Sequence, residues 1–311
     1  MRYFEAAEID RALTFPKLIE ALADAFRGGF IVPQRHHHAI AYADGSHATH
    51  LLMPAWRSAG DYLGVKIVNV FPENGKLGLP AVQGTYVLQS GRTGETLALF
   101  DGVRLTTWRT AAASALAASY LARANARKLL LVGSGALAPF LARAHASVRP
   151  IESIEVWNHR SEGAQRLAAT LGAEGFNVSV ADDLQDAVPK ADIISCATLS
   201  HSALIPGAWL QPGQHIDLVG AFNMQMREVD DVALRRARIF IDTPAAMNEG
   251  GDVAQAIAAG ALTKSDIAGD LAALVSGAPA RTTAEEITLF KSVGASLEDL
   301  AAAILVYSSS P

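Results

Sequence analysis

The sequence has one cysteine, no excess of positive charge and no long apolar run. Because Cys196 stands alone among 311 residues, a disulfide framework and a cysteine-ligated zinc site are both excluded. Lys and Arg number 26 against 31 Asp and Glu, and a net charge of −5 argues against nucleic-acid binding, which needs a basic face. No apolar run reaches the roughly 18 residues that are needed to cross a bilayer.

The chain is rich in apolar residues. Half of the residues are hydrophobic and only 18% are charged, so a disordered chain is excluded and a large buried core is expected. Acidic residues at Glu5, Glu8 and Asp10 make the start of the sequence unlike a secretory signal. Together these features predict a cytoplasmic globular enzyme without a membrane segment.

The first hundred residues predict a helix and a small, partly antiparallel sheet. Thr14 is expected to cap a helix that ends at Gly28. Strand-like segments separated by turn residues follow it. These strand-like segments are 63–70, 81–88 and 96–100. An alanine-rich helix is expected over 110–122, with Arg109 just before it.

From residue 127 onward, short apolar strands alternate with helical segments, one of which Ser161 is expected to cap and which is expected to run to Leu171. This alternation predicts an α/β fold with a doubly wound parallel sheet. The strand-like runs are 128–132, 154–157, 178–180, 193–195, 216–219 and 239–241. The tail from Ile287 onward is expected to be helical, because its apolar residues recur at helical spacing.

A glycine motif follows the first of these strands. It consists of Gly133, Ser134, Gly135, Ala136, Leu137 and Ala138. This is the Rossmann fingerprint GxGxxG with alanine in the third place. Gly133 permits the tight turn, Gly135 lets the backbone approach a pyrophosphate, and free N–H groups at the helix start face the phosphates. The alternative is a plain glycine turn between strand and helix.

The end of the next strand bears on the choice of cofactor. NAD enzymes usually place an acidic residue there for the ribose hydroxyl. This chain has Asn158, His159 and Arg160, which would tolerate or pair with a 2′-phosphate, so NADP is expected and NAD remains open. Thr198 and Val219, at the ends of later strands, are further candidate cofactor contacts.

Three cations of the first domain are candidates for holding a substrate. Lys66 lies inside an apolar segment, where a lysine is costly unless it pairs or works. Arg109 has the fork that binds a carboxylate, and Arg35 is a third candidate. Taken singly, each is better interpreted as an ordinary surface cation. The run His36–His38 is not expected to bind metal, because neighbouring side chains on a strand point to opposite faces.

Several segments together resemble the ornithine cyclodeaminase/mu-crystallin family, in the family's order and over nearly the whole chain. They are 50–55, 65–68, 106–113 (TTWRTAAA), the Gly133 loop, 196–198, 215–230 and 288–294. The resemblance implies a Rossmann domain over 114–288 beside an α+β substrate and dimerisation domain, 1–113 completed by 289–311. It also implies a homodimer.

The resemblance also implies roles for particular residues. Arg35 and Arg109 would hold a substrate carboxylate, with Met53 beside them, and Lys66 would assist as a charge or a proton partner. Lys66 and Arg109 are the catalytic candidates. No metal is implied.

One position departs from the cyclodeaminases. They carry an aspartate where this chain has Phe222, which cannot accept a proton or pair with an ammonium group. We therefore expect an NAD(P)H-dependent reductase of a small cyclic ketimine, such as pyrroline-2-carboxylate or piperideine-2-carboxylate. The alternatives are ornithine cyclodeaminase, an amino-acid dehydrogenase, and an NADPH-dependent binding protein without turnover.

Overall fold

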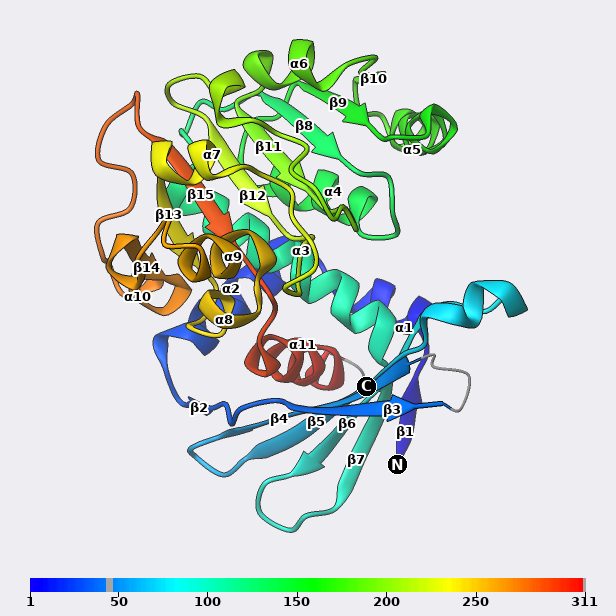
Figure 1. Cartoon of the computed structure of the whole chain (residues 1–311). Helices are drawn as coiled ribbons and strands as arrows, with labels where there is room; N and C mark the ends of the chain where they lie inside the picture. Colours follow the sequence, from blue (N-terminus) through cyan, green and yellow to red (C-terminus); the bar gives the residue numbers. More distant parts are fainter. Residues whose placement is uncertain (43–46, 310–311) are drawn as a thin grey trace. The chain divides into compact units, whose positions relative to one another are not determined.

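The computed structural model describes residues 1–42 and 47–309 and falls into two compact units (Figure 1). Unit 1 combines Met1–Thr110 with Ala295–Pro311, and unit 2 is Ala111–Gly294. The predicted limits, 113/114 and 288/289, fall inside a helix and a strand of this structure. Within the described residues, no helix is long and apolar enough to span a membrane.

Unit 1 is built on a seven-stranded sheet in the order β1-β7-β6-β5-β4-β2, with β3 also paired to β4. Its strands are β1 (Arg2–Phe4), β2 (Phe30–Ile31), β3 (His36–Ala41), β4 (His47–Arg57), β5 (Tyr62–Val70), β6 (Val82–Ser90) and β7 (Thr96–Asp101). Its helices are α1 (Ala6–Ala12), α2 (Phe15–Arg27), the 3-10 turn η1 (Pro72–Leu77) and α11 (Ser296–Ser308). Only β1, beside β7, pairs in parallel among the described strands of this sheet.

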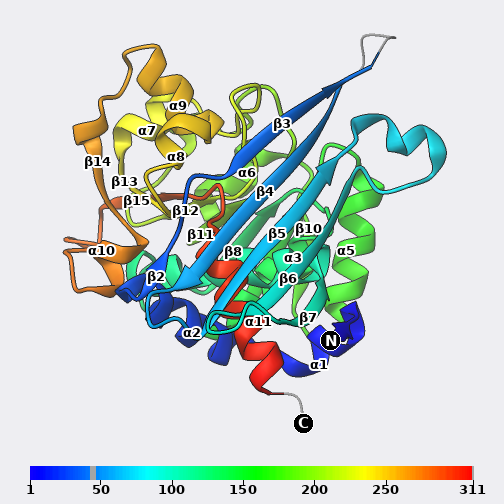
Figure 2. The same cartoon turned by 90° about the horizontal axis from the view of Figure 1, so that it is seen from below.

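The sheet of unit 1 has two different faces, because side chains alternate along each strand. Met53, Lys66 and Tyr86 stand in one cross-strand row and are buried. Helix α11 packs on β4, β5 and β6 and against α2. The other face, seen from below in Figure 2, carries half-exposed apolar residues such as Val65 and Ile67.

Unit 2 contains an eight-stranded parallel sheet in the order β10-β9-β8-β11-β12-β15-β13-β14. Its strands are β8 (Lys128–Val132), β9 (Ser153–Trp157), β10 (Val178–Val180), β11 (Ile193–Cys196), β12 (His215–Leu218), β13 (Ala237–Ile241), β14 (Ile267–Asp270) and β15 (Ile287–Lys291). The predicted doubly wound parallel sheet is confirmed, and its central strands β8, β11, β12 and β15 are short and almost entirely buried.

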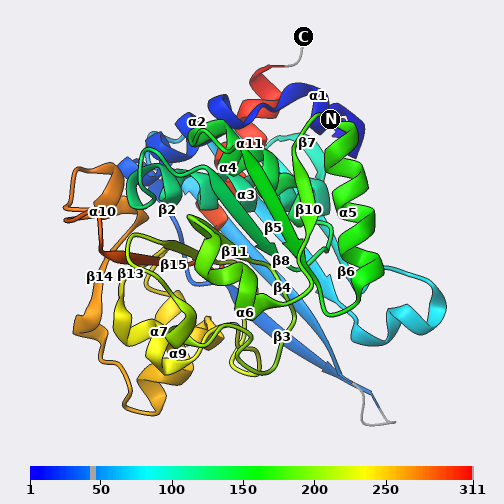
Figure 3. The same ribbon diagram turned by 90° about the horizontal axis from the view of Figure 1, so that it is seen from above.

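Helices cover both faces of this sheet. Helices α4 and α5 lie on one side and α6 and α7 on the other (Figure 3). The helical segments are α3 (Gly102–Leu121, which begins in unit 1), α4 (Ala138–Val148), α5 (Ser161–Ala173), α6 (Leu184–Ala187), η2 (Val188–Lys190), η3 (Gly207–Trp209), α7 (Asp231–Arg236), α8 (Ala246–Glu249), α9 (Gly251–Ala258), η4 (Lys264–Asp266) and α10 (Leu271–Val275).

Two predictions about helices were wrong. The stretch Ile287–Lys291 is not helical; it forms β15, which lies between β12 and β13 with all five residues buried. A short apolar run that is buried on every side has the same pattern in a strand and in a helix. The helix begins only at Ser296, after Gly294 turns the chain with a φ of +80°. Arg109 also lies within α3 rather than before it.

Candidate functional site

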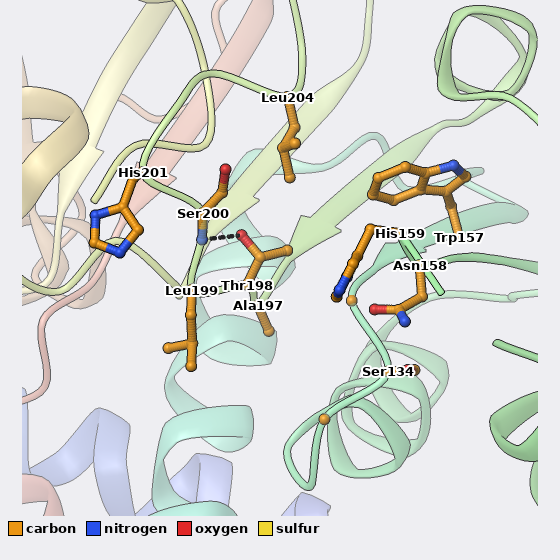
Figure 4. A pocket seen from close by; sticks show the side chains of 12 residues that line it. Ser134, Trp157, Asn158, His159, Ala197, Thr198, Leu199, Ser200, His201 and Leu204 are labelled. Atoms are coloured by element: carbon orange, nitrogen blue, oxygen red, sulfur yellow. Dashed lines mark hydrogen bonds between the residues drawn. The ribbon is translucent and has the colours of Figure 1, made fainter. Parts of the chain in front are cut away.

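A pocket of about 450 Å³ opens at the carboxyl ends of β8, β9 and β11 in unit 2 (Figure 4). Six of the predicted cofactor residues line it: Gly133, Ser134, Gly135, Asn158, His159 and Thr198. The lining residues that the sequence reasoning missed are Trp157, Ala197, Leu199, Ser200, His201 and Leu204. Trp157 is the last residue of one predicted parallel strand, and the other five follow the end of another, which is the signal that could have indicated them.

The glycine loop has the geometry that its motif predicts. Gly133 has a φ of +108°, and a Cβ there would lie 2.7 Å from the carbonyl oxygen of Ala197. Ala136 and Leu137 continue the loop to the start of α4. Among the described residues, no acceptor takes a hydrogen bond from the backbone N–H groups of 134–137. These donors therefore suit the phosphates of a dinucleotide.

Helix α5 comes unusually close to this loop. At Gly163, a Cβ would lie 2.5 Å from the hydroxyl oxygen of Ser134 and 2.9 Å from the amide nitrogen of Asn158. A side chain at position 163 would therefore displace the side chains of Ser134 and Asn158, both of which line the pocket.

The residues at the end of β9 are polar and carry no carboxylate. The amide of Asn158 donates to the carbonyl of Arg160 at 2.9 Å, and Nε of Arg160 donates to Nε2 of His159 at 3.0 Å. Both His159 and Arg160 are exposed. Arg160 does not line the pocket, and neither does Val219, which is buried where β12 ends.

A second cluster of polar residues is buried in unit 1 and contains both catalytic candidates. Nζ of Lys66 lies 2.9 Å and 2.8 Å from the two carboxylate oxygens of Asp299, and donates to the hydroxyl of Thr106 at 3.2 Å. Arg109 donates from Nε to Asp299 at 3.1 Å and from Nη1 to Glu298 at 2.8 Å. Two cations and two carboxylates thus share one site.

Burial and charge shift the proton affinities of this cluster. Loss of solvent, helped by repulsion from Arg109, lowers the pKa of Lys66 to about 8, while Asp299 opposes the shift. Burial alone would also lower the pKa of Arg109, but Asp299 and Glu298 raise it above its ordinary value. Arg109 is therefore a permanent cation, and Lys66 exchanges its proton near neutral pH.

The other two substrate candidates lie on the same sheet. Met53 is buried and pairs directly with Lys66 across β4 and β5. Arg35 immediately precedes β3, whose first residue, His36, pairs with Leu52 of β4. Arg35 therefore lies just outside the paired strand, next to the segment of β4 that carries Met53.

The sequence reasoning missed Glu298 and Asp299. They lie in the first turn of α11, and both are fully buried. Two adjacent acids at the start of an apolar helix usually face solvent, where they favour the helix dipole. A hint was available in Lys66, which lies inside an apolar segment of the same domain, since a buried cation needs a buried partner.

The histidines and Phe222 complete the set of predicted positions. The ring of His38 lies between those of His36 and His50, with its centroid 6.3 Å from each of theirs. Among the described residues, no group of His, Cys, Asp and Glu side chains has the geometry of a metal site. Phe222 follows β12, and 45% of its surface is exposed. It supplies no acid or base at the position where cyclodeaminases carry aspartate.

The fold and the glycine loop define a Rossmann protein with a pocket at the carboxyl ends of its parallel strands, and unit 1 contains a buried charge cluster. Residues 5–310 match the model of the ornithine cyclodeaminase/mu-crystallin family, and the chain belongs to this family.

Relatives of known name span the same length. A Delta(1)-pyrroline-2-carboxylate reductase of Colwellia psychrerythraea is 37% identical, with 97% of each chain covered. The ketimine reductase mu-crystallin of Mus musculus is 34% identical, with 96% of this chain and 92% of that protein covered. The solved Delta(1)-pyrroline-2-carboxylate reductase of Thermococcus litoralis, in complex with NADH and L-proline, superposes with a TM-score of 0.93 at 31% identity. That superposition covers 99% of this chain and 97% of that one.

Proposed function

We propose that this protein reduces a small cyclic imino acid, such as pyrroline-2-carboxylate or piperideine-2-carboxylate, with a nicotinamide dinucleotide. The observation that carries the proposal is the buried pair of Lys66 and Arg109 in a chain that also has a dinucleotide pocket. The pyrroline-2-carboxylate reductases and the ketimine reductase among its relatives support it.

The carboxylate of the substrate needs a fixed cation. Arg109 uses Nε and Nη1 for Asp299 and Glu298, and no described residue accepts a hydrogen bond from its Nη2. This nitrogen can bind a carboxylate oxygen, while the two acids hold the guanidinium plane in place. Arg35 would supply the second cation, and Met53 an apolar contact with the ring of the substrate.

The imine nitrogen needs a proton, because an iminium carbon is the better hydride acceptor. With a pKa of about 8, Lys66 is mostly protonated at neutral pH and can still release its proton. Asp299 and Thr106 take two of its three donor positions, so one remains for the substrate. Bound NAD(P)H supplies the hydride.

The residues of the pocket fit a dinucleotide. The unused N–H groups of 134–137 match a pyrophosphate, and Trp157 and Leu204 offer apolar surface. We favour NADP over NAD, because Asn158 and Arg160 present no negative charge to a 2′-phosphate. Binding constants for NADPH and NADH test this, and Arg160→Glu should weaken NADPH binding more than NADH binding.

An assay of substrates tests the reaction. We expect consumption of NADPH or NADH with pyrroline-2-carboxylate and formation of proline. The Lys66→Ala and Arg109→Ala variants should lose about a hundredfold or more in kcat/KM while still binding the cofactor. The matched control is Arg92→Ala, which removes an exposed cation of unit 1. Ammonia release from ornithine without added reductant, and no turnover of any ketimine, would overturn the proposal in favour of a cyclodeaminase.

We further propose a homodimer that uses the open face of the unit 1 sheet. Leu52, Val65, Ile67 and Val87 form apolar cross-strand neighbours there and are only half-buried. An antiparallel sheet that is apolar on both faces is expected to have both faces covered. Light scattering should give twice the mass of the chain, and Ile67→Glu should return it to a monomer; a monomeric wild type would refute this.

A further inference from the structure

Unit 2 completely buries three charged side chains that have no role in the proposed chemistry: Lys291, Asp252 and Glu228. Nζ of Lys291, at the end of β15, lies 3.1 Å from Oδ2 of Asp252 and donates to the carbonyl of Gly220. Oδ1 of Asp252 accepts the backbone N–H groups of Glu228 and Val229 at 2.7 and 3.0 Å. The segment after β12 is therefore held at both ends by one buried ion pair.

Glu228 connects this buried ion pair with the pocket through hydrogen bonds to Thr198. Its Oε1 accepts hydrogen bonds from the backbone N–H of Thr198 at 2.7 Å and from the Thr198 hydroxyl at 2.8 Å. These two bonds fix the rotamer of Thr198, which lines the pocket (Figure 4). The methyl group of Thr198 lies 3.2 Å from the Cβ position of Gly133, the first glycine of the nucleotide loop. A chain of contacts thus connects Glu228 with the phosphate-binding backbone.

The backbone around Glu228 is tightly constrained. At Gly220, a Cβ would lie 2.3 Å from Oε1 of Glu228 and 2.4 Å from the carbonyl oxygen of Thr198. The next residue, Ala221, has a φ of +43° and is the one described non-glycine residue in that region. A left-handed alanine is strained and persists only where its surroundings impose it. Such strain is typical of functional sites.

We propose that Glu228 is a positioning residue of the dinucleotide pocket, which holds Thr198 against the nucleotide loop and makes cofactor affinity depend on its own protonation. This inference rests on the proposed cofactor, but not on the substrate.

The surroundings of Glu228 give its carboxylate a proton equilibrium near neutrality. Burial raises the pKa of Glu228 to about 7, with Asp252 adding to the shift and Lys291 opposing it. The nearby thiol of Cys196 stays neutral, because burial raises its pKa further. Among the described residues, Oε2 of Glu228 has no hydrogen-bond partner, so the proton has an open position there.

Ionisation should strengthen the hold on Thr198. A carboxylate accepts hydrogen bonds about twice as strongly as a neutral carboxyl group. Cofactor affinity is therefore expected to fall as the pH is lowered through 7.

The test measures NADH binding by nicotinamide fluorescence between about pH 5 and pH 9 in the wild type and in Glu228→Gln. NADH is the probe, because the 2′-phosphate of NADPH itself titrates near pH 6. Histidine also changes charge in this range, and His159 and His201 line the pocket. The ratio of the two dissociation constants cancels their effect.

Glutamine imitates the protonated acid, so the ratio of variant to wild-type Kd should rise from near one at about pH 5 to about fivefold or tenfold at about pH 9. The control Glu285→Gln, which removes an exposed charge of unit 2, should keep the wild-type profile. If Glu228→Gln does not fold, Thr198→Val replaces it and should weaken binding more at high pH than at low pH.

A ratio that does not change with pH overturns the proposal. So does a ratio that falls as the pH rises, which repulsion between Glu228 and the cofactor phosphates would produce. A wild type that binds neither NADH nor NADPH at any pH would instead refute the proposed function.

Discussion

Replacing Asp299 by asparagine should move the alkaline limb of the pH profile to lower pH. In the wild type, Lys66 is the expected proton donor, so kcat/KM should fall as the pH rises through about 8. Asp299, with its oxygens 2.8 and 2.9 Å from Nζ, is the group that keeps this pKa from falling further. Asparagine has the same shape but no charge.

The size of the effect follows from the lost charge. An opposite charge at this distance typically shifts a pKa by about one to three units. The pKa of Lys66 would then fall from about 8 to between about 5 and 7. At pH 7 the protonated fraction would drop from about nine tenths to between about one half and one hundredth, and kcat/KM with it.

The assay is kcat/KM for pyrroline-2-carboxylate over the pH range, with the fold verified by circular dichroism. Glu298→Gln is the matched control, because Glu298 pairs with Arg109 and raises the pKa of Lys66 less than Asp299 does. It should move the limb less than Asp299→Asn does. A lower rate with an unmoved limb in Asp299→Asn would refute the assignment of Lys66 as the titrating group.

Four further substitutions test burial and packing. Lys66 releases its proton more easily when folded, so wild-type stability relative to Lys66→Met should rise by about 3 kcal/mol between about pH 8 and 10.5, measured by urea unfolding. Tyr86→Phe removes a buried hydroxyl that has no described partner and should leave Tm unchanged or higher. Gly64→Ala, with its Cβ 2.3 Å from that oxygen, should cost about 1–3 kcal/mol. Gly163→Ala should weaken NADH binding about tenfold, unlike Gly172→Ala in the same helix, where a Cβ meets no atom.

The nucleotide pocket was predictable because its parts are local. A strand, the Gly133 loop and a helix follow one another directly, and each step of that motif has a stereochemical reason. The other walls come from residues after β9 and β11, which parallel pairing with β8 brings to the same edge. Periodicity could not distinguish the strand β15 from a helix, because both of its faces are buried.

The charge cluster of unit 1 was only half predictable. Lys66 and Arg109 were conspicuous as cations in apolar surroundings, but their partners are 233 and 190 residues away in sequence. No local pattern connects an acid in α11 with a strand of the first hundred residues. The same holds for Glu228 and Thr198, which are 30 residues apart and meet only because β11 and β12 are neighbours.

This distribution of charge makes α11 part of the site rather than a cover for the sheet. Without Glu298 and Asp299, Lys66 and Arg109 would face an apolar interior unpaired, and breaking such a buried pair typically costs about 3–5 kcal/mol. The cations therefore favour the docking of α11, and the docked helix in turn holds the cations in the orientation that a carboxylate substrate requires. Because the same contacts stabilise unit 1 and orient its site, a variant of Asp299 is expected to affect stability and the pH profile together, whereas a variant of an apolar residue of α11 should affect stability alone.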